Sequence, residues 1–163
     1  MRLAFGCCCA MLLACAQPAA KPDNAPAVYT QSSDVQRMVV VRLKYGTDML
    51  DGLKQAVARE KIKNAVILSG FGSVTAYHVH VVGNMSFPPK DIFTKEGGPY
   101  DLLTVSGLIM DGRVHAHITL ATPQRVLGGH LEPGTSVFTF TNISLAVLSG
   151  PVDLSRNDDW QWR

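Results

Sequence analysis

Runs of apolar and β-branched residues, separated by short polar or glycine-containing segments, predict most elements of this chain. Strand-like runs lie at residues 35–44, 65–69, 74–82, 100–110, 113–121 and 136–148. One segment, residues 48–61, has a helical period instead, because it places Leu50, Leu53 and Val57 on a single apolar face. Thr47 or Asp48 can cap the first turn of this helix.

Turn signals between these runs indicate how the strands connect. Asp111-Gly112 is a strong hairpin signal, and the Gly70-Phe71-Gly72 segment predicts a bend. Residues 84–98 contain two prolines and two glycines, which predicts a loop or an irregular edge, and residues from 149 onward form a polar tail. We therefore expect an α+β fold, in which a largely antiparallel sheet of about six to seven strands is flanked by one principal helix.

The first residues have the pattern of an export signal. One basic residue, Arg2, precedes an apolar run over residues 3–14 that is too short to span a bilayer. The sequence Leu-Leu-Ala-Cys at residues 12–15 resembles the bacterial lipobox, which predicts that Cys15 is lipidated and becomes the mature N-terminus. Cleavage within residues 16–20 by the general signal peptidase is the alternative. Either reading predicts export into the bacterial cell envelope, as a protein lipid-anchored to a membrane or otherwise periplasmic or extracellular.

This pattern divides the chain into four parts. Residues 1–15 form the signal, and residues 16–34, which contain three prolines, form a flexible tether. Residues 35–150 form the folded domain and residues 151–163 the C-terminal tail. A chain of 163 residues with 47% hydrophobic and 17% charged residues has the composition of one globular domain.

Charge and cysteine content exclude two classes of function. The net charge of +2 leaves no clustered basic face of the kind that binds nucleic acid. All four cysteines lie in the first 15 residues, so the folded body has no cysteine for a nucleophile, a disulfide or a thiolate metal site.

The histidines carry the most specific chemistry. His115 and His117 are two residues apart on a predicted strand and therefore point to the same face. His130 follows Gly128-Gly129, a predicted glycine loop that can turn it toward the pair. Three neutral imidazoles suit a divalent metal such as zinc and leave a fourth position open for a water or a ligand.

The functional roles of other polar residues are less clearly indicated by the sequence. Glu132 and Asp101 could supply a general acid or base, and both are also explained as surface or turn carboxylates. His78 and His80 form a second H-x-H, which we interpret as one polar face of a strand and do not include in the predicted metal site.

The motifs together resemble the PPC (plants and prokaryotes conserved) domain family over residues 36–149. The resemblance rests on VVRLKYGTDMLDGLKQAV, ILSGFGSVTAY, PYDLLTVSGLI, HAHITLA and GGHLEPGTSV, in that order. It implies an antiparallel sheet with one main helix, and a homotrimer with sites near subunit boundaries. It also implies that His115, His117 and His130 bind a metal, usually zinc. Asp101 departs from the family pattern, which more often has Glu at that position.

Two functions remain open on this reading. One is an exported, lipid-anchored protein with a three-histidine metal site and a role in binding or assembly, where the metal serves structure or a small-molecule ligand. The alternative is a zinc-dependent hydrolase or lyase acting on a small carbonyl or carboxylate compound, suggested only by fold-level analogy to acetolactate decarboxylase. A DNA-binding role is disfavoured, because the chain lacks the Arg-Gly-Arg-Pro hook of plant members and carries an export signal.

Overall fold

A computed structural model describes residues 26–160 of the chain. The predicted signal, the lipidation site Cys15 and the first part of the predicted tether lie outside the described residues, as does Trp162. No helix within the described part is long and apolar enough to cross a membrane.

The chain forms six strands and one α-helix in the described residues. In order they are β1 (Val35–Lys44), α1 (Met49–Arg59), β2 (Ala65–Val82), β3 (Asp91–Met110), β4 (Arg113–Ala121), β5 (Val126–Leu131) and β6 (Ser136–Leu148). This arrangement confirms the expected antiparallel sheet with a single helix.

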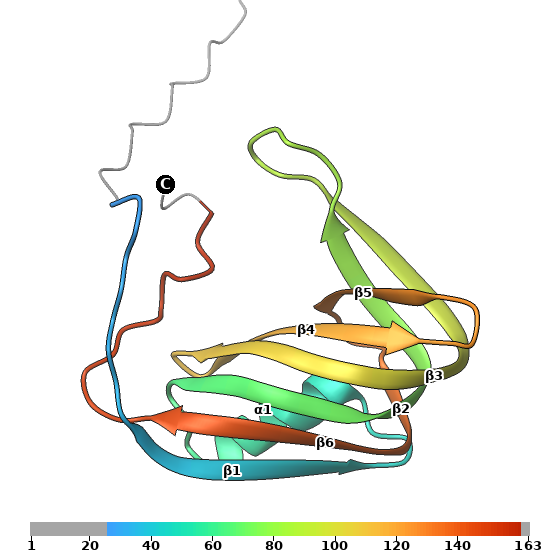
Figure 1. Cartoon of the computed structure of the whole chain (residues 1–163), viewed down its shortest axis with the longest axis horizontal. Coiled ribbons are helices and arrows are strands. Elements are labelled where there is room, and N and C mark those ends of the chain that lie inside the picture. Colours follow the sequence, from blue (N-terminus) through green and yellow to red (C-terminus); the bar gives the residue numbers. More distant parts are fainter. Residues whose placement is uncertain (1–25, 161–163) are drawn as a thin grey trace, which may run out of the picture.

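The six strands form one antiparallel sheet in the order β1-β6-β2-β3-β4-β5 (Figure 1). The sheet also closes on itself, because β5 pairs with the far end of β2 through Val79–Leu131 and His80–His130. The strands β2, β3, β4 and β5 therefore form a closed ring. Beyond the ring, the ends of β2 and β3 continue as a hairpin that projects from the sheet (Figure 1).

Helix α1 covers one side of the sheet and supplies much of the core. Its buried face includes Leu50, Leu53 and Val57, the three positions expected from the sequence period. Asp48 is the N-cap, and its carboxylate accepts a hydrogen bond from the backbone N–H of Asp51 at 3.0 Å. Burial of this face against alternating strand residues holds the helix, since an 11-residue helix is marginal alone.

Two predicted interruptions of the sheet are absent from the structure. The bend at residues 70–72 is wrong, because β2 runs through it with irregular register. Gly72 makes this possible: at a φ of +153°, a Cβ on this residue would lie 2.0 Å from the carbonyl oxygen of Phe140.

The loop expected at residues 84–98 is also wrong over its second half, where β3 starts at Asp91. This part of β3 is exposed at almost every position, so it lacks the apolar alternation that marks a half-buried strand. Gly128 and Gly129 likewise lie within strand β5 rather than in the predicted loop.

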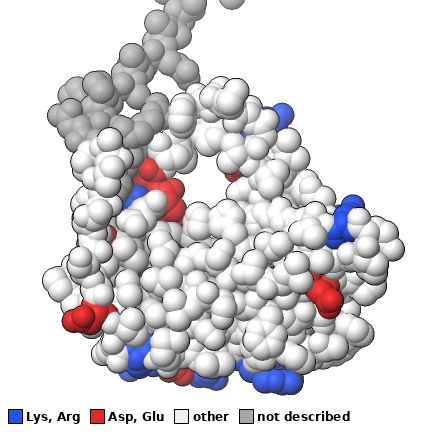
Figure 2. All heavy atoms as spheres, viewed as in Figure 1, with Lys and Arg blue, Asp and Glu red and all other residues white. Residues whose placement is uncertain are grey.

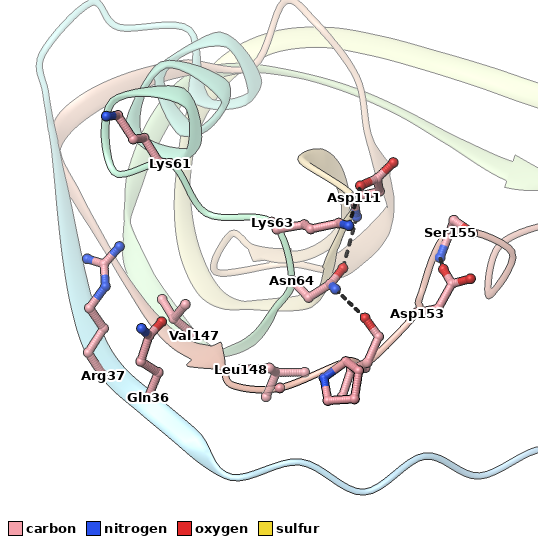
Figure 3. Close-up of a pocket in the computed structure, with 13 residues that line it drawn as sticks. Gln36, Arg37, Lys61, Lys63, Asn64, Asp111, Val147, Leu148, Asp153 and Ser155 are labelled. Atoms are coloured by element: carbon pink, nitrogen blue, oxygen red, sulfur yellow. Dashed lines mark hydrogen bonds and ion pairs between the residues drawn. The ribbon is translucent and has the colours of Figure 1, made fainter.

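The segment after β6 docks onto the domain along residues 150–155. Val152 and Leu154 are buried and pack with Met110. The buried side chain of Asn64 donates to the carbonyl of Val152 at 2.7 Å and accepts from the N–H of Asp111 at 3.0 Å, inside a pocket of about 590 Å³ (Figure 3). These contacts fix the direction in which the chain continues toward residue 160.

The side of the sheet away from α1 is poor in charge. Figure 2 shows that the visible face carries few Lys, Arg, Asp or Glu side chains. Large apolar side chains of β1, β2, β3 and β6 are exposed there or at its edges, namely Met38, Val40, Leu68, Phe71, Leu103 and Phe138. Several large apolar side chains exposed on one charge-poor face mark it as a candidate contact surface.

Candidate functional site

The strand register brings three histidines into one row. His117 on β4 lies directly opposite His130 on β5, and His130 lies directly opposite His80 on β2. Directly opposed residues in antiparallel strands project to the same face, with their Cβ atoms about 5 Å apart. The row runs across the strands that close the ring, on the side of the sheet away from α1, because the alternating residues Val79, Ala116 and Leu131 are buried in the core.

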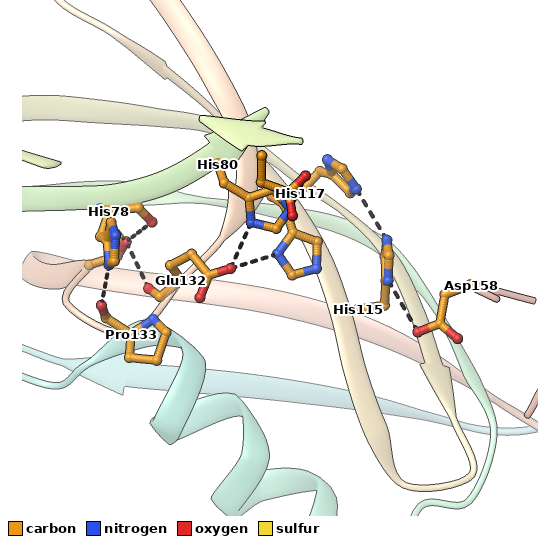
Figure 4. A network of polar contacts seen from close by, with 10 residues as sticks. His78, His80, His115, His117, Glu132, Pro133 and Asp158 are labelled. Atoms are coloured by element: carbon orange, nitrogen blue, oxygen red, sulfur yellow. Dashed lines mark hydrogen bonds and ion pairs between the residues drawn. The ribbon is translucent and has the colours of Figure 1, made fainter. Parts of the chain in front are cut away.

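Each of these strands carries a second polar residue two positions from the row. They are His78 on β2, His115 on β4 and Glu132 directly after the end of β5. The two histidines share the face of their row partners because strand side chains alternate with a period of two, and the Glu132 carboxylate reaches the same cluster. Figure 4 shows His80, His115, His117 and Glu132 gathered on one side of the strands.

The imidazole rings of the three predicted ligands are in mutual contact. Ring centroids are 4.7 Å apart for His115 and His130, 5.2 Å for His117 and His130, and 5.3 Å for His115 and His117. The Nε2 atoms of His115 and His117 approach to 3.2 Å. Two ligands of a tetrahedral zinc ion at about 2.0–2.1 Å lie roughly 3.4 Å apart, so this pair nearly has the required spacing.

Glu132 lies between two of the imidazoles. Its Oε1 is 2.7 Å from Nδ1 of His80 and 3.5 Å from Nδ1 of His130 (Figure 4). The rings of His80 and His130 stack with centroids 4.5 Å apart. Nδ1 of His130 is buried and makes no hydrogen bond, and the Glu132 carboxylate is the charged group nearest to it.

Burial and mutual repulsion favour the neutral form of two of the imidazoles. The pKa of His117 is lowered by burial first and then by the nearby His115 and His80 rings. The pKa of His130 is lowered by burial and by the other three histidines, against a smaller opposing effect of Glu132. A neutral imidazole is the form that binds a metal.

The double glycine allows β5 to approach both neighbouring strands. A Cβ on Gly128 would lie 2.3 Å from the carbonyl oxygen of Ile118, and a Cβ on Gly129 would lie 2.6 Å from that of His80. Neither glycine has a positive φ, so their role is close approach rather than a tight turn. This approach is what sets His130 between β4 and β2.

The structure separates the two predicted acid or base candidates. Glu132 contacts the histidine cluster, whereas Asp101 is exposed and pairs with Ala121, four residues along β4 from His117. Asp101 instead lines a cavity of about 810 Å³ together with Phe71 and Phe138. It therefore does not join the histidines.

Sequence reasoning missed the part played by His80. One nitrogen each of His80 and His130 and one carboxylate oxygen of Glu132 lie within 4.8 Å of one another, so these three residues could hold a metal ion. The sequence signal was the H-x-H at His78 and His80, but only the pairing of β2 with β5 connects it to His130. His78 turns away to the carbonyl of Pro133, at 2.7 Å from its Nδ1.

Comparison with known proteins agrees with the fold. The model of the Plants and Prokaryotes Conserved (PCC) domain matches residues 30–149. A plant- and prokaryote-conserved (PPC) protein from Pyrococcus horikoshii superposes with a TM-score of 0.68, at 24% identity, over 83% of this chain and 94% of that one. A metal-containing protein from Archaeoglobus fulgidus also gives 0.68, at 23% identity, over 77% of this chain and 89% of that one.

A third solved structure, from Bacteroides thetaiotaomicron, is of a protein whose name proposes DNA binding; it has a TM-score of 0.62 at 15% identity, covering 72% and 82% of the two chains. At these identities the structures establish the fold alone. Among curated proteins, the bifunctional protein GlmU of a Synechococcus strain is 27% identical over 133 residues, which are 80% of this chain and 20% of GlmU. The chain thus spans about a fifth of that relative.

Proposed function

The chain belongs to the Plants and Prokaryotes Conserved domain family, and on that premise we propose that it is a metal-binding member whose ion is held by His115, His117 and His130. The observation that supports this proposal most directly is the distance of 3.2 Å between Nε2 of His115 and Nε2 of His117. The ring of His130 packs edge-on against both of these rings. The role is binding or assembly, and the open fourth position takes water or a small ligand.

Carboxylate placement favours this set over the alternative one of His80, His130 and Glu132. Glu132 faces the Nδ1 edge of His130, which leaves the Nε2 edge for the ion. In metal sites a ligating imidazole commonly uses its second nitrogen to contact a carboxylate, which fixes the ring and its tautomer. Oε1 of Glu132 is also only 2.7 Å from Nδ1 of His80, a hydrogen-bond distance that is shorter than the spacing of two metal ligands. Glu132 therefore orients His130, and His80 holds Glu132.

The donor set suggests zinc. Three neutral imidazoles suit zinc, and also copper or nickel, better than they suit the oxygen-preferring magnesium or calcium. The Archaeoglobus fulgidus relative, described as metal-containing, supports a metal in this fold. The lowered pKa values of His117 and His130 support binding at neutral pH, because protons compete less for these two ligands.

The same proposal includes an assembly and a location. The charge-poor face with exposed Val40, Phe71 and Phe138 supports self-association, because burial of such a surface between subunits removes it from water, and the family resemblance makes a homotrimer the expected form. The lipobox-like sequence ending at Cys15 supports export and a lipid anchor in the cell envelope, where nucleic acid is not a partner. Labelling of the protein with palmitate in cells, lost in Cys15→Ser, tests the anchor.

Metal binding by single variants tests the ligand set. Purified domain is stripped with a chelator, and zinc affinity is measured for wild type, His117→Ala and His80→Ala. We expect His117→Ala to lose binding, whereas His80→Ala binds up to about 100-fold more weakly through disorder of Glu132. Loss in His80→Ala with wild-type binding by His117→Ala would transfer the site to His80, His130 and Glu132. Absence of binding by the wild type would end the proposal.

A further inference from the structure

The segment that follows the matched domain reaches the histidine cluster. The family match ends at residue 149, and residues 150–160 continue along the domain. Burial of Val152 and Leu154 and the contact of Asn64 with Val152 fix the first part of this segment. The chain then passes over the start of β4, which lies next to His115 in sequence.

Arg113 attaches the second part of the segment. Its guanidinium donates to both carboxylate oxygens of Asp158, at 2.9 and 3.1 Å, and to the carbonyl of Ser155 at 2.8 Å. A bidentate pair of this kind fixes the plane of the carboxylate as well as its position. Arg113 and His115 are two residues apart on β4 and share a face, so a carboxylate held by the first is presented to the second.

The carboxylate of Asp158 faces one particular nitrogen of His115. Its Oδ2 lies 3.5 Å from Nδ1 of His115, and the opposite nitrogen, Nε2, is the one that approaches His117 (Figure 4). Asp158 is mostly shielded from water, with 21% of its side chain exposed. A carboxylate at the Nδ1 edge favours a proton on Nδ1 and leaves the lone pair on Nε2.

We propose that Asp158, supplied by the segment outside the shared domain, is a positioning residue that orients His115 for metal binding. This inference rests on the proposed function. It gives His115 the partner that Glu132 provides for His130, so two of the three ligands have a carboxylate at their Nδ1 edge. Residues 150–160 thereby become part of the metal site.

Cobalt binding to the metal-free full chain tests this inference, because the visible bands of cobalt report ligand geometry directly. Affinity and spectrum are compared for wild type, Asp158→Asn and Asp159→Asn. The control is matched, since Asp159 is the adjacent carboxylate and forms its ion pair with Arg156, whereas Asp158 faces His115. We expect Asp158→Asn to bind cobalt about 10- to 100-fold more weakly with altered bands. Asp159→Asn stays as wild type, and Asp158→Glu recovers part of the loss.

The melting temperature of the metal-free proteins separates a site effect from a folding effect. We expect it to change little in Asp158→Asn, because the Arg113–Asp158 pair is partly exposed. If Asp158→Asn does not yield folded protein, Arg113→Gln serves instead, because it removes the attachment and keeps the carboxylate. Wild-type affinity and bands in whichever of these variants is folded would overturn the inference, as would equal losses in Asp159→Asn. Absence of cobalt binding by the wild type would overturn the proposed function itself.

Discussion

Substitution of Gly128 by alanine should separate β5 from β4 and loosen the metal site. The added Cβ would lie 2.3 Å from the carbonyl oxygen of Ile118 and 3.3 Å from the Cα of Thr119. Both are backbone atoms of β4, so no side chain can rotate away to make room. Ordinary contact begins near 3.4 Å, and the two strands must therefore separate locally by about 1 Å.

Two consequences follow, one for stability and one for the site. Overpacking of this kind costs about 1–3 kcal/mol, which corresponds to a fall of about 2–12 °C in melting temperature for a domain of this size. His130 follows Gly128 by two residues and lies opposite His117, so the same separation moves these two ligands apart. A misplacement of about 1 Å is large for a ligand bond of about 2.0–2.1 Å, so zinc affinity should fall as well.

Thermal melting of the metal-free protein and zinc titration below the melting temperature measure the two effects separately. Gly97→Ala is the matched control, because Gly97 is also a strand glycine without a positive φ and a Cβ there would meet nothing closer than 4.0 Å. We expect this control to melt and to bind zinc as the wild type does. Wild-type melting and affinity in Gly128→Ala would refute the close-approach argument.

Three further predictions concern the helix ends and the pH dependence of the site. Lys61→Gly should raise the melting temperature or leave it unchanged. Lys61 follows α1 at a φ of 52°, where a side chain strains the backbone by about 1–2 kcal/mol. Glycine removes this strain, but it also adds about 0.4–1 kcal/mol of chain entropy to the unfolded state, which offsets part of the gain. Asp48→Ala should lower stability by about 1–2 kcal/mol in denaturant titrations, because Asp48 caps α1 and also accepts from the N–H of Gly134 at 2.6 Å; an unchanged midpoint would contradict the cap. Zinc affinity, measured from pH 5 to 8, should weaken as the pH falls, since protons compete with zinc for the neutral imidazoles. The lowered pKa values of His117 and His130 shift their part of this loss below the ordinary imidazole pKa of about 6.5; an affinity that does not change down to pH 5 would contradict this.

Local patterns predicted the elements that are half-buried, and failed where the chain is exposed on both sides. Strands β1, β4 and β6 each place buried residues in the core and exposed residues on the surface, and their predicted bounds agree with the structure. The first part of β3 has no buried side, so its residues carry no apolar period and the segment appeared to be a loop. Gly72 appeared to be a break because glycine is typical of bends, whereas here it admits the backbone of Phe140.

The same distinction applies to the candidate site. The shared face of His115 and His117 follows from two positions on one strand and needs no tertiary information. The place of His80 depends on the pairing of β2 with β5, which joins residues 50 positions apart and leaves no local signal. The contact of Asp158 with His115 depends on where the polar C-terminal segment docks, and the pattern of apolar residues does not indicate this either.

The closure of the sheet explains why the site lies where it does. β5 contributes only six residues, yet it pairs with β4 on one side and with β2 on the other. Its two glycines permit both approaches, and the next residue is the central histidine. Because His80 of β2 holds Glu132 beside His130, the site proposed on β4 and β5 is complete only while β5 is paired with β2. Metal binding and closure of the sheet should therefore stabilise each other, since an ion that binds only the closed form adds its binding free energy to that form.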